Sequence, residues 1–411
     1  MPRRSAGITS RHPYTIDRVL PIQHVHGDRR AGLMRVVFAT YMTRYPLGGM
    51  LSWAMQHIIG LKQLGCELTI VERANYADAC FDPAAGRVSD DPAAGLKIVR
   101  RLLKAHGLED DYVFRDINDR YFGLSSKETH ERINSADILI DSGNHGAWLD
   151  LAHAIPRRVL IDGEPGYTQI RMKQESSRKR LADQYTHHFS NGLLLHTDKH
   201  LAPDTGHTWL PFPNPVCTNQ FDDMPTPPKG AAWTTIMNWK AHQLLDFEGK
   251  TYGQKDMSFE IYETLPALTT QPIEIAVSGD APRTHLERLG WQISEAKTVT
   301  QTIGDYDSYI QRSLGEFSVA KHVFVEARTG WFSDRSAAYL AAGRPVILQD
   351  TGFSEVLPTG EGLFGVSSVE QAATAIDAVC TDYARHSTAA KEIARNYLEA
   401  SKCLKQVVEA N

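Results

Sequence analysis

Apolar and polar positions alternate along the chain with two different periods. Residues 34–40 form a short apolar run, and the apolar residues of 51–64 then recur three and four positions apart. The first pattern is typical of a strand and the second of a helix that buries one face. Another apolar run over 66–72 follows Gly65. These segments, with a turn over 44–49, predict a βαβ unit with parallel strands.

The same alternation continues toward the C-terminus. Apolar runs predict further strands at 137–141, 158–162, 193–196, 233–239, 273–277, 322–325 and 344–348. A helical pattern covers 333–342, and 387–410 has helical composition without Pro or Gly. Strands that alternate with helices predict α/β layers built on parallel sheets.

A proline-rich stretch divides this pattern into two halves. Four prolines between 203 and 215 precede Pro225-Thr226-Pro227-Pro228, and such stiff, non-helical composition is typical of a domain boundary. We therefore predict an N-terminal extension at 1–32, a first α/β domain at 33–224, a second at 229–385 and a C-terminal helical segment at 386–411.

Charge and composition narrow the range of functions. The 411 residues include 44 Lys and Arg against 49 Asp and Glu, which gives a net charge of −5. This sign is opposite to that of a duplex-binding surface, so we expect no nucleic acid partner. No run of about 18 apolar residues occurs, and no apolar core of secretory length follows Met1. We expect a cytoplasmic protein without integral membrane association.

Several common site motifs are missing from the sequence. The five cysteines are scattered without a C-x-x-C pair, so we expect reduced thiols and neither disulfides nor a zinc site. Gly48 and Gly49, with Glu72 ending the next strand, invite a dinucleotide site, but their loop lacks the G-x-G-x-x-G spacing. A helix start of this kind can still bind part of a ligand.

The stretch from Arg328 to Val366 is the richest in candidate chemistry. A Gly-aromatic turn leads into a helix capped by Ser333, which Gly343 ends before a buried strand. The free N–H groups and the positive end of that helix, with Arg328 and Arg335 nearby, predict a diphosphate site.

This stretch resembles the donor-binding half of the nucleotide-sugar-dependent glycosyltransferases of the GT-B type. In both, a Gly-aromatic turn and a helix are followed by Ala-Gly-x-Pro-Val at 342–346, Gly-x-x-Glu-Val at 352–356 and a Gly-Leu strand start at 362–363. A weaker similarity links 45–50 to the Gly-rich acceptor-side loop of that fold, with Gly48, Gly49 and Met50 as its candidate residues.

The resemblance implies two Rossmann-like α/β domains that face each other across a cleft. The first would bind an acceptor and the second a nucleoside diphosphate sugar, with the final helix packing back on the first domain. The reaction that this resemblance implies needs no metal, because a helix dipole and basic side chains neutralise the charge of the leaving group. We therefore expect metal-independent chemistry and no cofactor besides the nucleotide sugar, which is a co-substrate.

Candidate donor contacts follow from strand ends, the turn and the helix of the second half. They are Asn238, Trp239, Lys255, Ser278, Gly279, Asp280, Arg328, Ser333, Asp334, Arg335, Ser336, Thr351 and Gly352. Many members of the family place two glutamates eight residues apart around this helix, where this chain has Gly330 and Ala338. Asp334 or Glu326 are possible substitutes.

Two loops that directly follow predicted strands supply candidates for the base that activates an acceptor hydroxyl. Asp141 and His145 are the preferred pair, and Asp162 and Glu164 come second. The alternative is that these polar residues only hold their loops through Asx-turns and caps.

The resulting prediction is a glycosyltransferase of the hexosyltransferase type that acts on a hydroxyl of a small-molecule acceptor, such as a natural product or a nucleoside. Two alternatives stay open: a sugar-nucleotide epimerase or hydrolase on the same scaffold, and a non-catalytic sugar-nucleotide-binding protein.

Overall fold

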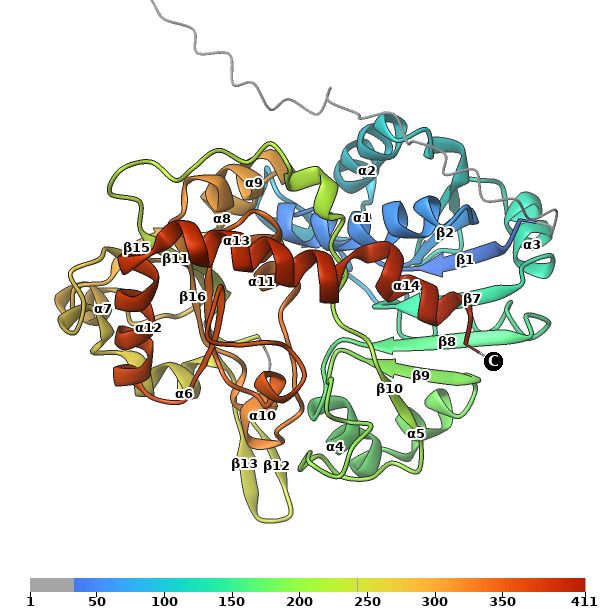
Figure 1. The fold of residues 1–411 in the computed structure, drawn as a ribbon. Helices are drawn as coiled ribbons and strands as arrows, with labels where there is room; N and C mark the ends of the chain where they lie inside the picture. Colours follow the sequence, from blue (N-terminus) through green and yellow to red (C-terminus); the bar gives the residue numbers. More distant parts are fainter. Residues whose placement is uncertain (1–32, 242, 411) are drawn as a thin grey trace, which may run out of the picture.

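The computed structural model describes residues 33–241 and 243–410, so the predicted extension at 1–32 lies outside the described residues. Two sheets with helices on their faces form the described part (Figure 1). The first sheet has the strand order β10-β9-β8-β7-β1-β2-β5-β6, and the second has the order β15-β14-β11-β16-β17-β18. Within these two sheets every pair except β5–β6 is parallel. The predicted α/β class is confirmed.

The first sheet and its helices occupy the first half of the chain. Their elements are β1 (Arg35–Ala39), α1 (Gly48–Gln63), β2 (Glu67–Arg73), β3 (Cys80–Asp82), β4 (Arg87–Ser89), α2 (Ala93–Ala105), β5 (Tyr112–Arg115), β6 (Tyr121–Gly123), α3 (Ser126–Asn134), β7 (Ile138–Ser142), β8 (Arg157–Asp162), α4 (Tyr167–Gln174), α5 (Ser176–Ala182), β9 (His187–Ser190) and β10 (Trp209–Pro211). Leu51, Met55 and Ile58 of α1 are buried in one core with Phe38 of β1. The predicted stripe of α1 therefore does face the sheet.

The second sheet occupies the second half. Its elements and the helices around them are β11 (Trp233–Asn238), the hairpin β12 (Leu245–Phe247) and β13 (Lys250–Tyr252), α6 (Lys255–Phe259), β14 (Ile273–Ser278), α7 (Arg283–Arg288), β15 (Gln292–Glu295), α8 (Ala296–Thr300), α9 (Ile303–Arg312), β16 (Gly315–Ser318), α10 (His322–Glu326), α11 (Asp334–Ala341), β17 (Val346–Gln349), β18 (Leu363–Val366) and α12 (Val369–Thr381). The first sheet ends at Pro211 and the second begins at Trp233, with the proline-rich segment between them.

The last helices pass from the second sheet to the first (Figure 1). α13 (Tyr383–Ile393) packs near α11, a π-helical segment at Ala394–Leu398 follows, and α14 (Ala400–Val408) lies against α1. A Cβ on Gly60 of α1 would lie 2.8 Å from the Ala400 Cβ, so the close approach of the two helices requires glycine at this position. The predicted domain limits themselves stay predictions.

Three sequence-based assignments of local structure were wrong. Gly48 and Gly49 form the first turn of α1 instead of a loop before it. Residues 193–196 form turns rather than a strand, and 322–325 belong to α10. A four-residue apolar run does not distinguish a strand from a buried helix face. The strand near that position is β16, whose fully buried Glu316 interrupts the apolar pattern.

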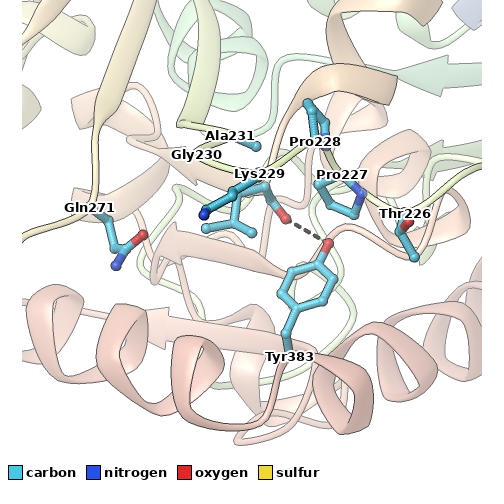
Figure 2. A pocket seen from close by; sticks show the side chains of 9 residues that line it. Thr226, Pro227, Pro228, Lys229, Gly230, Ala231, Gln271 and Tyr383 are labelled. Atoms are coloured by element: carbon cyan, nitrogen blue, oxygen red, sulfur yellow. Dashed lines mark hydrogen bonds between the residues drawn. The ribbon is translucent and has the colours of Figure 1, made fainter.

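The linker borders a shallow hollow of about 280 Å³ (Figure 2). Thr226, Pro227 and Pro228 line it together with Tyr383, whose hydroxyl donates a hydrogen bond to the Leu314 carbonyl at 2.8 Å. The hollow thus lies where the linker meets the start of α13.

All five cysteines are free thiols, as predicted. Across residues 33–241 and 243–410, no three His, Cys, Asp or Glu side chains are placed to hold a metal ion. No helix among the described residues is both long enough and apolar enough to cross a bilayer.

Candidate functional site between the two sheets

Loops at the carboxyl ends of the strands join the two halves of the chain. Glu164, which follows β8, forms an ion pair with Lys321 at the start of α10, with its two oxygens 2.5 and 2.6 Å from the ammonium. Nearby, the Leu194 N–H donates to the Thr329 carbonyl at 3.0 Å. In open α/β sheets ligands bind at these strand ends, so the candidate site lies between the two sheets.

The helix α11 begins at this junction. Ser333 caps it, because the Ser333 hydroxyl accepts a hydrogen bond from the Arg335 N–H at 3.2 Å. The predicted cap is therefore confirmed. Such a helix start presents backbone N–H groups and a positive dipole end to the space in front of it.

The Arg335 side chain is engaged by the protein itself. Its guanidinium pairs with the fully buried Glu316 carboxylate and donates to the Ile236 carbonyl at 2.6 Å and the Ser318 hydroxyl at 2.7 Å. Arg335 thus ties α11 to the carboxyl ends of β11 and β16. This geometry makes it a fixed positive charge beside the site, with three of its hydrogen bonds directed into the protein.

Lys255 is a different kind of cation. Its side chain is buried, and among the described residues its ammonium has no hydrogen-bond or ion-pair partner. Burial, together with the positive charges of Arg335 and Lys321, lowers the pKa of Lys255 to about 7, although the carboxylates of Glu316 and Asp334 oppose this shift. Three cations therefore gather at the start of α11, and Lys255 is the one without a direct hydrogen bond or ion pair among the described residues.

Other polar atoms on the same two segments also lack partners. Both polar side-chain atoms of Gln254 and the hydroxyls of Ser258 and Ser336 are buried without a hydrogen bond to any described residue. Since most buried polar groups in proteins are hydrogen-bonded, such a concentration favours a polar ligand. Ser336 was predicted from the sequence. Gln254 and Ser258 were not, although the polar run around Lys255 was the available signal.

The loop after β1 is held by one carboxylate. Glu72 accepts hydrogen bonds from the N–H groups of Met42, Thr43 and Arg44 at 2.9, 2.7 and 2.9 Å, and from the Tyr112 hydroxyl at 2.9 Å. These bonds engage the carboxylate that a dinucleotide fold would direct at a ribose. Glu72 shapes the loop instead.

The loop after β1 reaches the second half of the chain. Burial raises the pKa of Tyr41, and the carboxylates of Glu164 and Asp334 act on it in the same direction. Gly48, a predicted acceptor-side residue, lies so close to the Thr302 carbonyl that no Cβ would fit. Gly49 packs near Tyr306, and the Met50 sulfur accepts a weak hydrogen bond from Tyr41 at 3.8 Å.

The two predicted aspartates hold their own loops. Asp141 accepts hydrogen bonds from the N–H groups of Asn144 and Gly146 at 2.9 and 2.7 Å and from the Tyr185 hydroxyl at 2.6 Å. Asp162 accepts four, from the Glu164 N–H and from three side chains, Thr168, Gln169 and Ser190. Burial raises the pKa of Asp162, and these hydrogen bonds oppose that rise. The geometry favours a loop-forming role for both.

His145 and Glu164 are placed differently. His145 is exposed and has a positive φ of 52°. Glu164 is partly exposed and bonded to Lys321. No hydrogen bond links His145 to Asp141 among the described residues, so the structure does not join the preferred pair.

Eight further predicted donor contacts fall into two groups. Asn238 and Gly279 meet at the ends of β11 and β14, with Ser278 and Asp280 on either side of Gly279. Trp239 is buried against Phe259, with ring centroids 5.3 Å apart, and therefore packs in the core.

The second group lies in the contact between the two halves. Arg328 pairs with Glu355 and donates to the Lys199 carbonyl at 3.0 Å. The Thr351 hydroxyl donates to the Trp331 carbonyl at 2.7 Å, and a Cβ on Gly352 would lie 2.5 Å from the Leu194 side chain. These residues fix the turn before α11.

The two positions at which many members of the family carry glutamates, Gly330 and Ala338, leave no room for a longer side chain here. A Cβ on Gly330 would lie 2.8 Å from the Leu194 nitrogen, and Ala338 is buried. Glu326 pairs with Lys250 of the hairpin. Asp334 lies at the first position of α11, where burial raises its pKa and the Arg335 charge opposes that rise.

Comparison with known proteins identifies the fold. No family model matches the chain, and no curated protein matches it in sequence. An alpha-glucosyltransferase in complex with UDP and a 13-mer DNA is similar in structure, with a TM-score of 0.54 at 12% identity over 92% of this chain and 98% of that one. Anabaena HepE in complex with UDP and glucose has a TM-score of 0.52 at 11% identity, with the same coverage. A glycosyltransferase from Rickettsia africae also has a TM-score of 0.52, at 13% identity and the same coverage.

These neighbours correct one prediction. The exclusion of nucleic acid as a partner was wrong, because proteins of this fold have been solved with DNA. The exclusion rested on a net charge of −5, which is a sum over the whole chain and does not describe any one face. The two facing α/β domains, their parallel sheets and the returning C-terminal helix together give this chain the GT-B glycosyltransferase fold.

Proposed function

We propose that the chain transfers a hexosyl group from a nucleoside diphosphate sugar to an acceptor hydroxyl. In this reaction a bond forms between the acceptor oxygen and the anomeric carbon of the sugar. The bond from that carbon to the diphosphate oxygen breaks, and the hydroxyl proton passes to a base. The nucleoside diphosphate leaves with the electron pair of the broken bond.

The observation that carries the proposal is the unpaired ammonium of Lys255 beside the start of α11. A diphosphate placed there would pair with this ammonium and accept hydrogen bonds from the buried Ser336 hydroxyl and the backbone of α11. Arg335 and Lys321 would stabilise the charge that develops on the departing diphosphate. A uracil nucleotide is the first choice, because the similar structures hold UDP.

The acceptor side rests on the loops after β7 and β8. Of the four predicted bases, we favour Glu164 and His145. Asp141 and Asp162 are buried and hold their own loops, whereas His145 is exposed and Glu164 is partly exposed, with its ion pair to Lys321. A transfer assay separates the two. The residue that acts as base should lose transfer by about 100-fold or more on substitution without loss of donor affinity, because a positioned base contributes 10²–10⁴-fold.

The first experiment measures thermal shifts with uracil, guanine and adenine nucleoside diphosphates and their sugars. A ligand that binds only the folded protein raises its apparent stability. We expect a shift with one nucleotide, its loss in Lys255→Met, and its retention in the control Lys127→Met, since Lys127 is a surface lysine. A shift that survives Lys255→Met contradicts the proposed site.

Turnover then distinguishes transfer from its alternatives. Sugar release to water without an acceptor indicates a hydrolase, and interconversion of the nucleotide sugar indicates an epimerase. Tight binding without any turnover would instead indicate a sugar-nucleotide-binding protein.

A further inference from the structure

A strongly basic segment adjoins the acceptor side of the site. Residues 171–183, which run from α4 through α5, contain five Arg and Lys and two Asp and Glu. The local charge is therefore +3 in a chain whose total is −5. α4 and α5 lie together at the edge of the first domain, below β9 in Figure 1.

The segment contacts both loops that carry the favoured bases. Leu181 of α5 packs so close to Gly146 that a Cβ there would lie 2.7 Å from the Leu181 side chain. Gly146 directly follows His145. On the other side, α4 begins at Tyr167, three residues after Glu164. Charges on this segment therefore flank the place where an acceptor would enter.

The acids of the segment do not balance its cations. Glu175 is shared by Arg171 and Arg178, at 2.6 and 2.5 Å, and Asp183 lies 3.3 Å from Lys179. Two further cations remain. Arg180 bonds to the Ser176 hydroxyl at 3.0 Å, and exposed Lys173 has no ion pair among the described residues.

The segment exposes charge without apolar surface. None of the large exposed apolar side chains of the described residues lies between 171 and 183. A membrane-surface helix needs an apolar face to insert, and this one turns its apolar residues Met172 and Ala182 inward. A surface that exposes cations but no apolar face is complementary to a chain of phosphates.

We propose that α4 and α5 bind the phosphodiester backbone of a nucleic acid acceptor and hold it across the loops after β7 and β8. This inference rests on the proposed function, because it names the acceptor class of the same site. Contacts of this kind are independent of base sequence and weaken steeply with salt.

The test compares two matched double variants of the full chain. Lys173→Gln with Arg180→Gln removes two charges from the segment. Lys97→Gln with Arg100→Gln removes two exposed charges, neither in an ion pair among the described residues, from α2, which lies at the opposite edge of the domain in Figure 1. Fluorescence anisotropy with a labelled 12-nucleotide single strand gives the affinity of each protein as a function of salt. Thermal unfolding checks that both variants fold.

We expect the first variant to bind about ten-fold more weakly and to flatten the slope of log K against log salt by about 1.4, which corresponds to two contacts on a single strand. The α2 variant should match the original protein. Equal losses in both variants overturn the inference, as does binding to anionic vesicles but not to the oligonucleotide.

A parallel titration with UDP-glucose separates the two proposals. If UDP-glucose binds and the oligonucleotide does not, only the inference about the acceptor is refuted. If the oligonucleotide binds and UDP-glucose does not, only the donor site is refuted. The chain would then have a phosphate-binding surface without the proposed reaction.

Discussion

Binding of a nucleotide sugar should load a proton onto Lys255. The pKa of this buried lysine lies at about 7 in the free protein, so at pH 7.5 only about a quarter of the molecules carry its charge. A diphosphate at the start of α11 favours the charged ammonium and raises that pKa. If the pKa rises well above 8, binding takes up about three quarters of a proton at pH 7.5.

Isothermal titration calorimetry measures this uptake directly. UDP-glucose is titrated at pH 7.5 in buffers that differ in ionisation enthalpy, and the slope of the observed enthalpy gives the protons exchanged. The diphosphate of UDP-glucose is a diester that does not titrate near neutral pH, so its own protons do not contribute. The uptake should shrink at pH 6, where the lysine is already charged, and vanish in Lys255→Met.

The size of the affinity loss follows from the same contact. A hydrogen bond to a charged group contributes about 1.5–3 kcal/mol, so Lys255→Met should weaken UDP-glucose binding by about 10- to 150-fold. Lys127→Met should leave both affinity and proton uptake unchanged. Tight binding by the original protein with no proton uptake would refute the placement of the diphosphate at Lys255.

Three further outcomes test single side chains, two beside the site and one, Asp307, in α9. Arg335→Met leaves the fully buried Glu316 carboxylate without its partner, so the free energy of unfolding measured in urea should fall by about 3–5 kcal/mol. The double variant Arg335→Met/Glu316→Gln should recover part of this loss, and an unchanged stability of Arg335→Met contradicts the pairing. Glu164→Gln frees Lys321, so calorimetry should show UDP-glucose binding tightened about three-fold while transfer falls, and weaker binding contradicts this. Burial raises the pKa of Asp307 to about 7, so the folded state keeps a proton that an unfolded aspartate loses near pH 4. Its contribution to stability is present below pH 4 and is lost as the pH rises to about 7. The free energy of unfolding should therefore fall between pH 4 and 7 relative to Asp307→Asn, whereas parallel curves would contradict the shift.

The fold could be predicted because its local signals are redundant. The apolar stripe of α1 is spaced at the helical period and is buried as that spacing requires, and β1, β2 and β7 are apolar runs between clear turns. β16 was missed because the buried Glu316 interrupts its apolar pattern, and its partner Arg335 lies 19 residues further along the chain. A buried charge of this kind is invisible to a hydrophobic pattern.

The site was predicted less completely, because partners decide what a polar residue does. Lys255 stood out in a polar run, but only the structure separates it from a solvated lysine, since its side chain is buried in the folded chain. Arg328 belongs to the same sequence stretch as Ser333. In the structure, however, Glu355 and the Lys199 carbonyl hold Arg328 in the contact between the two halves. Gln254 stands in the same polar run, but a missing hydrogen bond has no sequence pattern of its own.

The division of labour between two cations links the fold to the proposed chemistry. Arg335 is kept charged by its buried carboxylate partner, and it joins α11 to the ends of β11 and β16. Its fixed charge helps to lower the pKa of Lys255, which has no hydrogen bond or ion pair among the described residues and can therefore change its protonation when a ligand arrives. A preorganised positive charge costs no rearrangement during the reaction. Lys255, the second cation, has a pKa close to neutral pH, so its charge in the complex depends on the negative charge that the diphosphate brings.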